Sequence, residues 1–169
     1  FTSGTTGEPK GLAVAHPPLA HFARWQARRF AIGPGDRVSM LSGLAHDPLL
    51  RDIFTTLSSG ATLLVPTQDD ILAPGQLSRW VAAARPTVCH LTPPLGEVML
   101  AGAPEAALQS VRLFFWGGDM LRPPLVARLR AAAPDALHVN FYGSTETPQA
   151  AAFFPLDEQP ALGPVRAIP

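Results

Sequence analysis

The sequence predicts an α/β fold in which strands and helices alternate around a mostly parallel sheet. Short apolar runs rich in β-branched and aromatic residues recur along the chain. Helical patterns separate these runs, and several of the helical patterns begin at a proline, which suits the first turn of a helix. With 169 residues and 47% hydrophobic content, the chain is long enough to bury one sizeable core.

In the first part of the chain we expect a strand at 12–16, then a helix over 17–30 that starts at two prolines. A short buried strand is expected within 36–43, after the turn at 33–36. Pro48 begins the next helix, with Asp47 as its N-cap acceptor, and Gly60 ends it. Its expected apolar face comprises Leu49, Leu50, Ile53, Phe54 and Leu57. Residues 61–65 return as a strand.

The second part continues the alternation. Residues 68–75 are typical of a loop, 76–85 of a helix, 87–91 of a buried strand, and a helix follows Pro93 and Pro94. The alanine-rich stretch 101–110 is expected to be a surface linker, followed by a strand in 111–119, a helix in 122–135 and a strand in 137–143. The proline-rich stretch 151–169 is expected to be extended. Parallel strands share the edge at which they end. We expect Asp47, His90, Gly117, Gly118 and Tyr142 each to lie just past a strand end and so to meet at one ligand-binding edge.

The composition argues against several classes of function. The 13 acidic and 13 basic residues balance, and no basic cluster is interleaved with aromatic residues, so nucleic acid is not an expected partner. No apolar run has membrane-spanning length, so a membrane is not expected either. Cys89 is the single cysteine, which excludes a disulfide within the chain and favours the reducing cytoplasm. We expect Cys89 to be a buried, inert thiol.

The stretch FTSGTTGEPKG, at 1–11, has the composition of a phosphate-binding loop. Its glycines permit close approach of the backbone to a ligand, and its serine and threonines supply hydroxyl donors. Lys10 is the only lysine among the 13 basic residues. The spacing is not that of a Walker A loop, because Pro9 precedes the lysine and Gly11 follows it. Without a second motif, an ordinary surface turn would be the better explanation of this composition.

The second motif is FYGSTETP, at 141–148. In this order and at this separation, the two stretches resemble the signature phosphate loop and the adenine and magnesium motif of the adenylate-forming enzyme superfamily. The resemblance implies part of the large N-terminal subdomain of such an enzyme. It further implies that 1–169 is a partial adenylation (AMP-binding) domain truncated at both ends, with the lysine-bearing C-terminal subdomain absent.

The same resemblance implies a nucleotide site. The phosphate loop would contribute Thr2, Ser3, Gly4, Thr5, Thr6, Gly7 and Lys10. Tyr142 would stack on adenine, Gly118 and Asp119 would line the adenine pocket, and Asn140 and Gly143 would complete the site. Thr145 would reach a phosphate and Glu146 would hold Mg²⁺, a hard cation that prefers oxygen ligands. Lys10, Thr145 and Glu146 would form the catalytic set of this chain.

The stretch HDPLLRDIF, at 46–54, narrows the resemblance to nonribosomal peptide synthetase adenylation domains, where an aspartate at the position of Asp47 pairs the α-ammonium of an amino acid. LSGLAHDPLLRDIFTTL, GATLLVPTQDDI, PGQLSRW and VCHLTPP resemble the adenylation domain of α-aminoadipate reductases. The substrate residues implied are His46, Asp47, Pro48, Arg51, His90, Phe115, Gly117, Phe141 and Gln149.

Three of these positions depart from the reductase pattern: Gly117 replaces a larger apolar residue, Phe141 a methionine, and Gln149 a second arginine. Arg51 would pair a side-chain carboxylate, but loss of the second cation weakens the case for a dicarboxylic substrate. Simpler alternatives stay open: Asp47 as a plain helix cap, Arg51 as a solvated arginine, and His90 as a satisfied core histidine.

The expected function is the ATP- and Mg²⁺-dependent activation of an amino acid as an aminoacyl-adenylate, with release of pyrophosphate. The aminoacyl group would then load onto the phosphopantetheine thiol of a carrier-protein domain, expected in the same polypeptide. An alternative within enzymes is an acyl-CoA or aryl-acid ligase. A different class of alternative is an inactive module that binds nucleotide or supports assembly.

Overall fold

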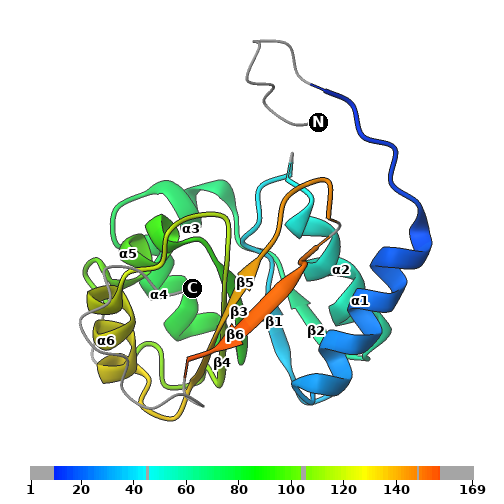
Figure 1. The fold of residues 1–169 in the computed structure, drawn as a ribbon. Coiled ribbons are helices and arrows are strands. Elements are labelled where there is room, and N and C mark those ends of the chain that lie inside the picture. The colour runs from blue at the N-terminus through cyan, green and yellow to red at the C-terminus, as the bar shows by residue number, and fades with distance from the viewer. Residues whose placement is uncertain (1–9, 45, 104–105, 148, 157–169) are drawn as a thin grey trace.

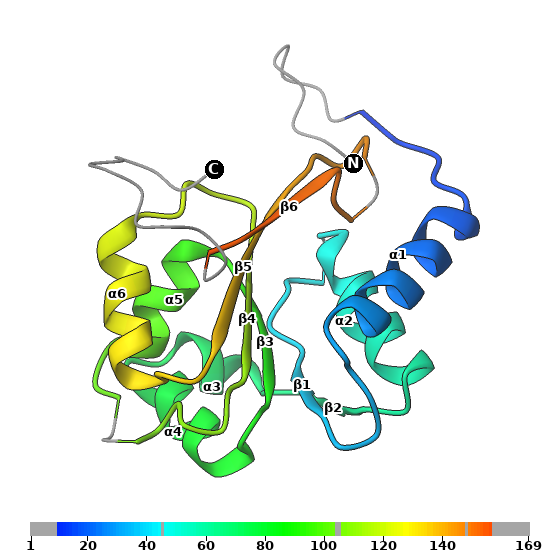
Figure 2. The same cartoon turned by 60° about the horizontal axis from the view of Figure 1, so that its bottom comes forward.

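The computed structural model describes residues 10–156 except 45, 104, 105 and 148. It has three layers, with one sheet between two groups of helices (Figure 1). Helices α1 (His16–Arg29) and α2 (Pro48–Ser58) lie on one face of the sheet, and contact each other closely. The opposite face carries α3 (Gln68–Leu72), α4 (Gln76–Ala84), α5 (Pro93–Leu100) and α6 (Pro123–Ala132), as the turned view in Figure 2 shows.

The sheet has six strands in the order β2-β1-β3-β4-β5-β6. These are β1 (Arg37–Ser39), β2 (Thr62–Leu64), β3 (Val88–Leu91), β4 (Leu113–Trp116), β5 (Leu137–Tyr142) and β6 (Ala152–Pro155). The first five in this order pair in parallel, and β6 pairs antiparallel with β5. The expected α/β class with a mostly parallel sheet is therefore confirmed.

Each face of the sheet has its own hydrophobic core. Between the sheet and α4–α6, fully buried side chains such as Leu77, Met99 and Trp116 interdigitate. On the face that α1 covers, Phe22 and Phe30 pack against Phe115 and the strand residues beside it. Strands that are buried on both faces read as continuous apolar runs, which is why LFFW and VCHL predict strands so clearly.

Prolines begin most of the longer helices, as the sequence predicts. Proline occupies the first positions of α1, α2, α5 and α6, where its missing N–H has no helical partner to lose. The short helix α3 was not expected, because its residues were interpreted as part of a loop. Thr67 and Asp70 form a capping box there: the Thr67 hydroxyl accepts from Asp70 N, and the Asp70 carboxylate accepts from Thr67 N.

Two other expectations for the fold were wrong. The strand expected at 12–16 is absent: residues 12–15 are exposed and form no strand, and His16 begins α1. The stretch 101–110 is not wholly a surface linker, because Ala107 and Leu108 are buried and Leu108 belongs to the core beside α4–α6. In the described part of the stretch after 151, the expected extended chain forms strand β6, whose antiparallel pairing with β5 no local pattern predicts.

Candidate active site

The sheet has a topological switch point between β1 and β3. From β1 the chain continues into α2 on one face, whereas from β3 it continues into α5 on the opposite face (Figure 2). The segments after the two neighbouring strands therefore separate, and it is in the crevice at such a switch point, at the carboxyl end of the sheet, that open α/β sheets bind ligands. The residues after β1, β3, β4 and β5 meet at this edge. Two positions need correction: His90 lies within β3, and Tyr142 is the last residue of β5, so neither lies past a strand end.

Several predicted substrate residues are in contact here. The Gln149 side chain donates a hydrogen bond from Nε2 to the carbonyl oxygen of Asp47, 3.3 Å away. Arg51 Cζ lies 5.6 Å from the ring centroid of Phe141. A Cβ atom at Gly117 would lie 3.5 Å from the carbonyl oxygen of Phe141, so the glycine keeps space open beside that strand. The structure thus brings Asp47, Arg51, Gly117, Phe141 and Gln149 together from segments up to 102 residues apart.

Asp47 does not act as the N-cap acceptor that the sequence predicted. It has helical backbone angles (φ −58°, ψ −29°), and its side chain makes no capping hydrogen bond. N-cap residues usually have extended angles, so the backbone conformation excludes the usual capping geometry. Its neighbours His46 and Pro48 are exposed and half-buried, respectively. The half-buried carboxylate of Asp47 is therefore at the crevice without a capping role.

Arg51 is buried, with 6% of its surface exposed, so the interpretation as a solvated arginine is wrong. Its Nε atom has no hydrogen-bond partner among the described residues. Burial lowers the pKa of the guanidinium, while the charges of Asp52 and Asp47 act in the opposite direction. A buried cation without full hydrogen bonding is costly, and an anionic or hydrogen-bond-accepting ligand group would reduce that cost.

His90 is buried, and both of its ring nitrogens face protein groups. Nε2 lies 2.8 Å from the amide nitrogen of Gln26, and Nδ1 lies 2.9 Å from a carboxylate oxygen of Asp52. Burial lowers the pKa of His90 more than the charge of Asp52 raises it, so the ring is neutral near pH 7. Its ring stacks on Phe115, with centroids 4.8 Å apart, and Phe115 stacks on Phe141 at 5.2 Å. Both nitrogens of His90 thus face protein groups, which favours the interpretation of His90 as a core histidine.

Sequence reasoning missed Gln26, Asp52 and Thr55, which are all buried polar residues in this region. The available signal was the second face of α2. Its buried residues Arg51, Asp52, Thr55 and Thr56 fall at i, i+1, i+4 and i+5, which is one side of a helix. Because the opposite side carries the leucines and Phe54, the usual amphipathic interpretation selected the wrong side as buried.

The nucleotide residues predicted from the second motif lie at the end of β5 and in the turn after it. Tyr142 is 73% exposed, so an aromatic face is open at this edge, whereas Asn140 is buried within β5. In the turn, Thr147 N donates to Ser144 O, which bends the chain around Thr145 and Glu146. Gly143 leaves little room for a side chain: a Cβ atom there would lie 3.0 Å from Ala150 Cα, so the turn would have to shift slightly to accept one.

Glu146 and Lys10 lie near each other. The pKa of Glu146 is lowered by hydrogen bonds from its own backbone N–H and from Ser144, and the charge of Lys10 contributes to the same shift. Both side chains are exposed. Gly118, across the edge, has a left-handed backbone (φ +82°), and Asp119 is exposed with its carboxylate accepting from Met120 N at 2.6 Å. The ionised carboxylate of Glu146, which lies beside the Ser144 hydroxyl, suits a hard divalent cation.

The predicted phosphate-loop residues Thr2, Ser3, Gly4, Thr5, Thr6 and Gly7 lie outside the described residues. Lys10 is the first residue of the described part of the chain. The contribution of Lys10 to the pKa of Glu146 is therefore the observation that connects the first motif to the second.

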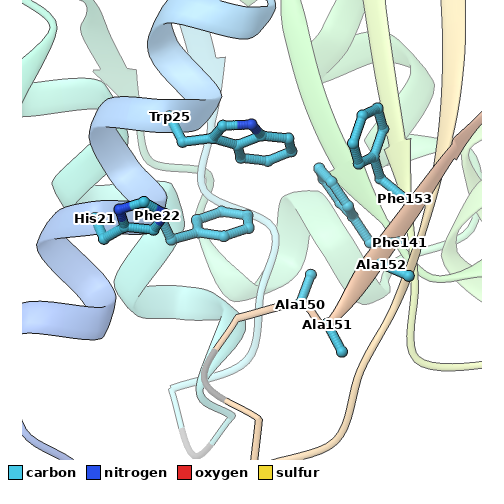
Figure 3. A pocket seen from close by; sticks show the side chains of 8 residues that line it. All are labelled: His21, Phe22, Trp25, Phe141, Ala150, Ala151, Ala152 and Phe153. Atoms are coloured by element: carbon cyan, nitrogen blue, oxygen red, sulfur yellow. The ribbon is translucent and has the colours of Figure 1, made fainter.

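A separate cavity of about 260 Å³ lies between α1 and the β5–β6 hairpin. Figure 3 shows its lining: His21, Phe22 and Trp25 from the helix, Phe141 and Phe153 from the two strands, and Ala150, Ala151 and Ala152. Of these residues, Phe141 alone belongs to the predicted substrate set. Aromatic rings make most of this wall, so the cavity differs in chemistry from the polar region around Asp47 and Arg51.

No helix among the described residues is long and apolar enough to cross a bilayer.

Comparisons with known proteins agree with this geometry. Residues 1–167 match the family model described as AMP-binding enzyme. The chain is 46% identical over 154 residues to the L-2-aminoadipate reductase large subunit of Eremothecium gossypii, covering 91% of this chain and 11% of that protein. The chain thus spans about a ninth of the length of this relative.

Solved structures give the same result. The Vibrio cholerae adenylation domain AlmE, in complex with glycyl-adenosine-5′-phosphate, has a TM-score of 0.86 and 30% identity, covering 99% of this chain and 31% of that one. The nonribosomal peptide synthetase FmoA3, bound to α-methyl-L-serine-AMP, has a TM-score of 0.84 and 36% identity, covering 89% of this chain and 17% of that one. The resemblance carried by the two motifs is confirmed, and the chain belongs to the AMP-binding enzyme family.

Proposed function

We propose that the protein containing this chain uses ATP to activate the carboxylate of an α-amino acid as an aminoacyl-adenylate. The observation that carries the proposal is Asp47, a carboxylate at the switch-point crevice that makes no helix-capping hydrogen bond and adjoins Arg51 and Gln149. A carboxylate in this position offers a charge-assisted partner for an α-ammonium group. The relatives support the proposal, since two of the structures similar to this chain hold an aminoacyl-adenylate.

In this reaction an oxygen of the substrate carboxylate attacks the α-phosphorus of ATP. The bond from that phosphorus to the bridging oxygen breaks, and pyrophosphate leaves with the electron pair. Little covalent work falls to side chains, so the protein contributes mainly position and charge. Lys10 and Thr145 would hold phosphate oxygens, and Tyr142 would present its exposed ring to adenine.

The carboxylate of Glu146 fits a Mg²⁺ ion, because it is exposed, ionised and next to hydroxyl groups. When bound, this ion would neutralise charge on the phosphates. We further propose that the aminoacyl group passes to a phosphopantetheine thiol on a carrier-protein domain of the same polypeptide, as the similarity to nonribosomal peptide synthetases suggests.

For the substrate side chain, the buried Arg51 favours an acidic group. Its Nε has no hydrogen-bond partner among the described residues. This one cation would hold the side-chain carboxylate, because the unpartnered Oε1 of Gln149 only accepts hydrogen bonds and would need a donor group of the ligand instead. A dicarboxylic amino acid is therefore our proposed substrate class, and the similarity to L-2-aminoadipate reductases is consistent with it.

Amino-acid-dependent ATP–pyrophosphate exchange, measured on the full polypeptide that contains this sequence, tests the proposal. We expect exchange with α-amino acids and fastest exchange with dicarboxylic ones. The Asp47→Ala variant should lose amino-acid-dependent exchange while its affinity for ATP stays unchanged, and Asp69→Ala, an exposed acid on α3, is the matched control. Exchange only with acids that lack an α-amine would instead support an acyl-CoA or aryl-acid ligase. If the polypeptide binds ATP but catalyses no exchange with any acid, the alternative of an inactive nucleotide-binding module would be supported.

A further inference from the structure

The buried side of α2 carries a polar network that the reaction itself does not explain. Asp52, the residue after Arg51, is fully buried. Its Oδ2 accepts a hydrogen bond from Ser42 N at 3.2 Å. Its Oδ1 lies 2.9 Å from Nδ1 of His90. The two atoms are within ion-pair distance of each other, and neither has a hydrogen-bond partner elsewhere among the described residues. Asp52 therefore connects the segment after β1 to strand β3.

The remaining members fix the tautomer of His90. Thr55 donates its hydroxyl proton to Oε1 of Gln26, 2.9 Å away, which leaves the Gln26 amide nitrogen facing Nε2 of His90 at 2.8 Å. With the Gln26 amide in this orientation, its nitrogen donates to Nε2, and the ring proton is then on Nδ1, facing the Asp52 carboxylate. Both nitrogens of His90 are thus engaged within the protein, and neither is available to a substrate.

The ring of His90 is instead the start of a stacked column. His90 stacks on Phe115 with an interplanar angle of 19°, and Phe115 stacks on Phe141 at the same angle. The guanidinium of Arg51 then lies over the Phe141 ring. The column spans strands β3, β4 and β5, and its two ends meet consecutive residues of α2: Asp52 at His90 and Arg51 at Phe141.

We propose that Asp52 and Gln26 are positioning residues that determine amino-acid specificity without touching the amino acid. Asp52 and Gln26 hold the plane of His90, and the stacked rings carry this orientation through the buried Phe115 to Phe141, whose ring lies under the Arg51 guanidinium. Asp52 also fixes the rotation of α2 about its axis, and thereby the direction of Arg51. The proposal rests on the proposed function, since it assigns these rings and Arg51 to the amino-acid site. Nucleotide binding, which uses the turn after β5, should not depend on it.

Kinetics on the full polypeptide separate a positioning role from a structural one. The Asp52→Asn variant keeps the shape of the side chain but loses the charge and one acceptor. We expect its KM for the preferred amino acid to rise about tenfold or more, since small misplacements of binding groups are costly. The KM for ATP should stay within about twofold of wild type. Asp69→Asn, the same change at an exposed site on α3, should alter neither constant.

Two further variants cover the case in which Asp52→Asn folds poorly. Thr55→Val removes the hydroxyl that holds the Gln26 amide, at nearly unchanged volume, and should raise the amino-acid KM by about threefold with ATP unaffected. Gln26→Glu replaces the donor to His90 with an acceptor, so it should move the ring proton or add a second one. Imidazole ¹⁵N shifts of labelled protein would report that change directly.

A merely structural network would give a different pattern. Loss of folded protein lowers kcat through the active fraction and lowers the melting temperature, but leaves both KM values unchanged. That pattern, or an equal rise in both KM values, would overturn the proposal. Absence of amino-acid-dependent exchange in the wild-type polypeptide would contradict the proposed function instead, so the two failures are distinguishable. Finding the His90 proton on Nε2 in wild type would also contradict the assigned network.

Discussion

The ion pair between Arg112 and Asp36 offers a quantitative test of what holds the sheet together at the end opposite the crevice. Arg112 precedes β4, and Asp36 precedes β1. The guanidinium donates four hydrogen bonds: from Nε to Asp36 Oδ1 at 2.9 Å, from Nη2 to Asp36 Oδ2 at 2.7 Å, from Nη1 to Phe30 O at 3.1 Å, and from Nη2 to Ala31 O at 2.9 Å. One side chain thus joins two strands and the end of α1.

We expect Arg112→Met, which keeps the aliphatic stem, to lower the free energy of unfolding by about 2–3 kcal/mol. The Asp36 side chain is 9% exposed, so it would lose its charged partner in a largely buried position. It would keep only neutral donors, the Thr87 hydroxyl at 2.6 Å and Gly33 N at 3.0 Å. Because the Arg112 side chain is 38% exposed, solvent compensates part of the loss, and the effect should stay below the about 3–5 kcal/mol expected of a fully buried pair.

Urea unfolding, followed on the domain that contains the chain, measures this effect. Arg128→Met is the matched control, because Arg128 and Glu97 form a 2.6 Å pair that is about half exposed on both sides. Arg128→Met should lower the free energy of unfolding by about 0.5 kcal/mol or less. Equal losses in the two variants would refute the argument that burial and fork geometry make the Arg112 pair strong.

The same pair gives the sign of a pH effect. Burial by itself raises the pKa of Asp36, but the hydrogen bonds from Arg112, Thr87 and Gly33 N and the charge of Arg112 outweigh it, so the pKa lies below its ordinary 3.8. The stabilisation is complete above the ordinary pKa and is lost as the pH falls through the lowered one. The difference in free energy of unfolding between wild type and Arg112→Met should therefore become smaller as the pH falls below about 3.8. A difference that persists unchanged at lower pH would contradict the assignment to this ionisation.

Two more predictions concern single residues. Cys89 is fully buried, and burial, together with the charge of Asp52, raises the pKa of its thiol to about 12. We therefore expect iodoacetamide at neutral pH to alkylate this cysteine only after denaturation, as mapped by mass spectrometry. Rapid labelling of Cys89 in the native protein would refute its burial. Gly143→Ala places a Cβ atom 3.0 Å from Ala150 Cα and should shift the turn that carries Thr145 and Glu146. We expect kcat of pyrophosphate exchange to fall about tenfold, with little change in melting temperature. Unchanged exchange would show that the turn accepts the extra methyl group without moving these two residues.

Much of the fold follows from local signals. The helices begin at the prolines that predict them, and the buried strands VCHL and LFFW coincide with continuous apolar runs. These signals act over a few residues, so the sequence carries them completely. The five-residue helix α3 also had a local signal, Thr67 with Asp70 three residues later, which is a capping box with aspartate in place of the usual glutamate.

Failures of prediction arise where the structure depends on distant partners. Residues 11–15 alternate like a strand, but alternation produces a strand only when a neighbouring strand accepts the hydrogen bonds. The network of His90 joins residues up to 64 positions apart, and glutamine, aspartate and threonine in helices are normally interpreted as solvated. Of the candidate site, the two motifs and the position of Asp47 were predictable, whereas the groups that orient His90 and Arg51 were not.

Helix α2 shows most clearly why a hydrophobic pattern can mislead at a functional site. Its expected core residues Leu50, Phe54 and Leu57 are 39%, 48% and 60% exposed, while Arg51 and Asp52 on the other side are 6% and 0% exposed. Turning the helix to bury the apolar side would gain hydrophobic free energy, at about 25 cal/mol per Å² of apolar surface. It would also break the contacts of Asp52 with Ser42 N and His90, and would leave a carboxylate and an imidazole unsatisfied at the crevice. The charged side of α2 therefore faces the sheet because its polar groups have their partners there, and the apolar pattern of the helix does not by itself determine which side is buried.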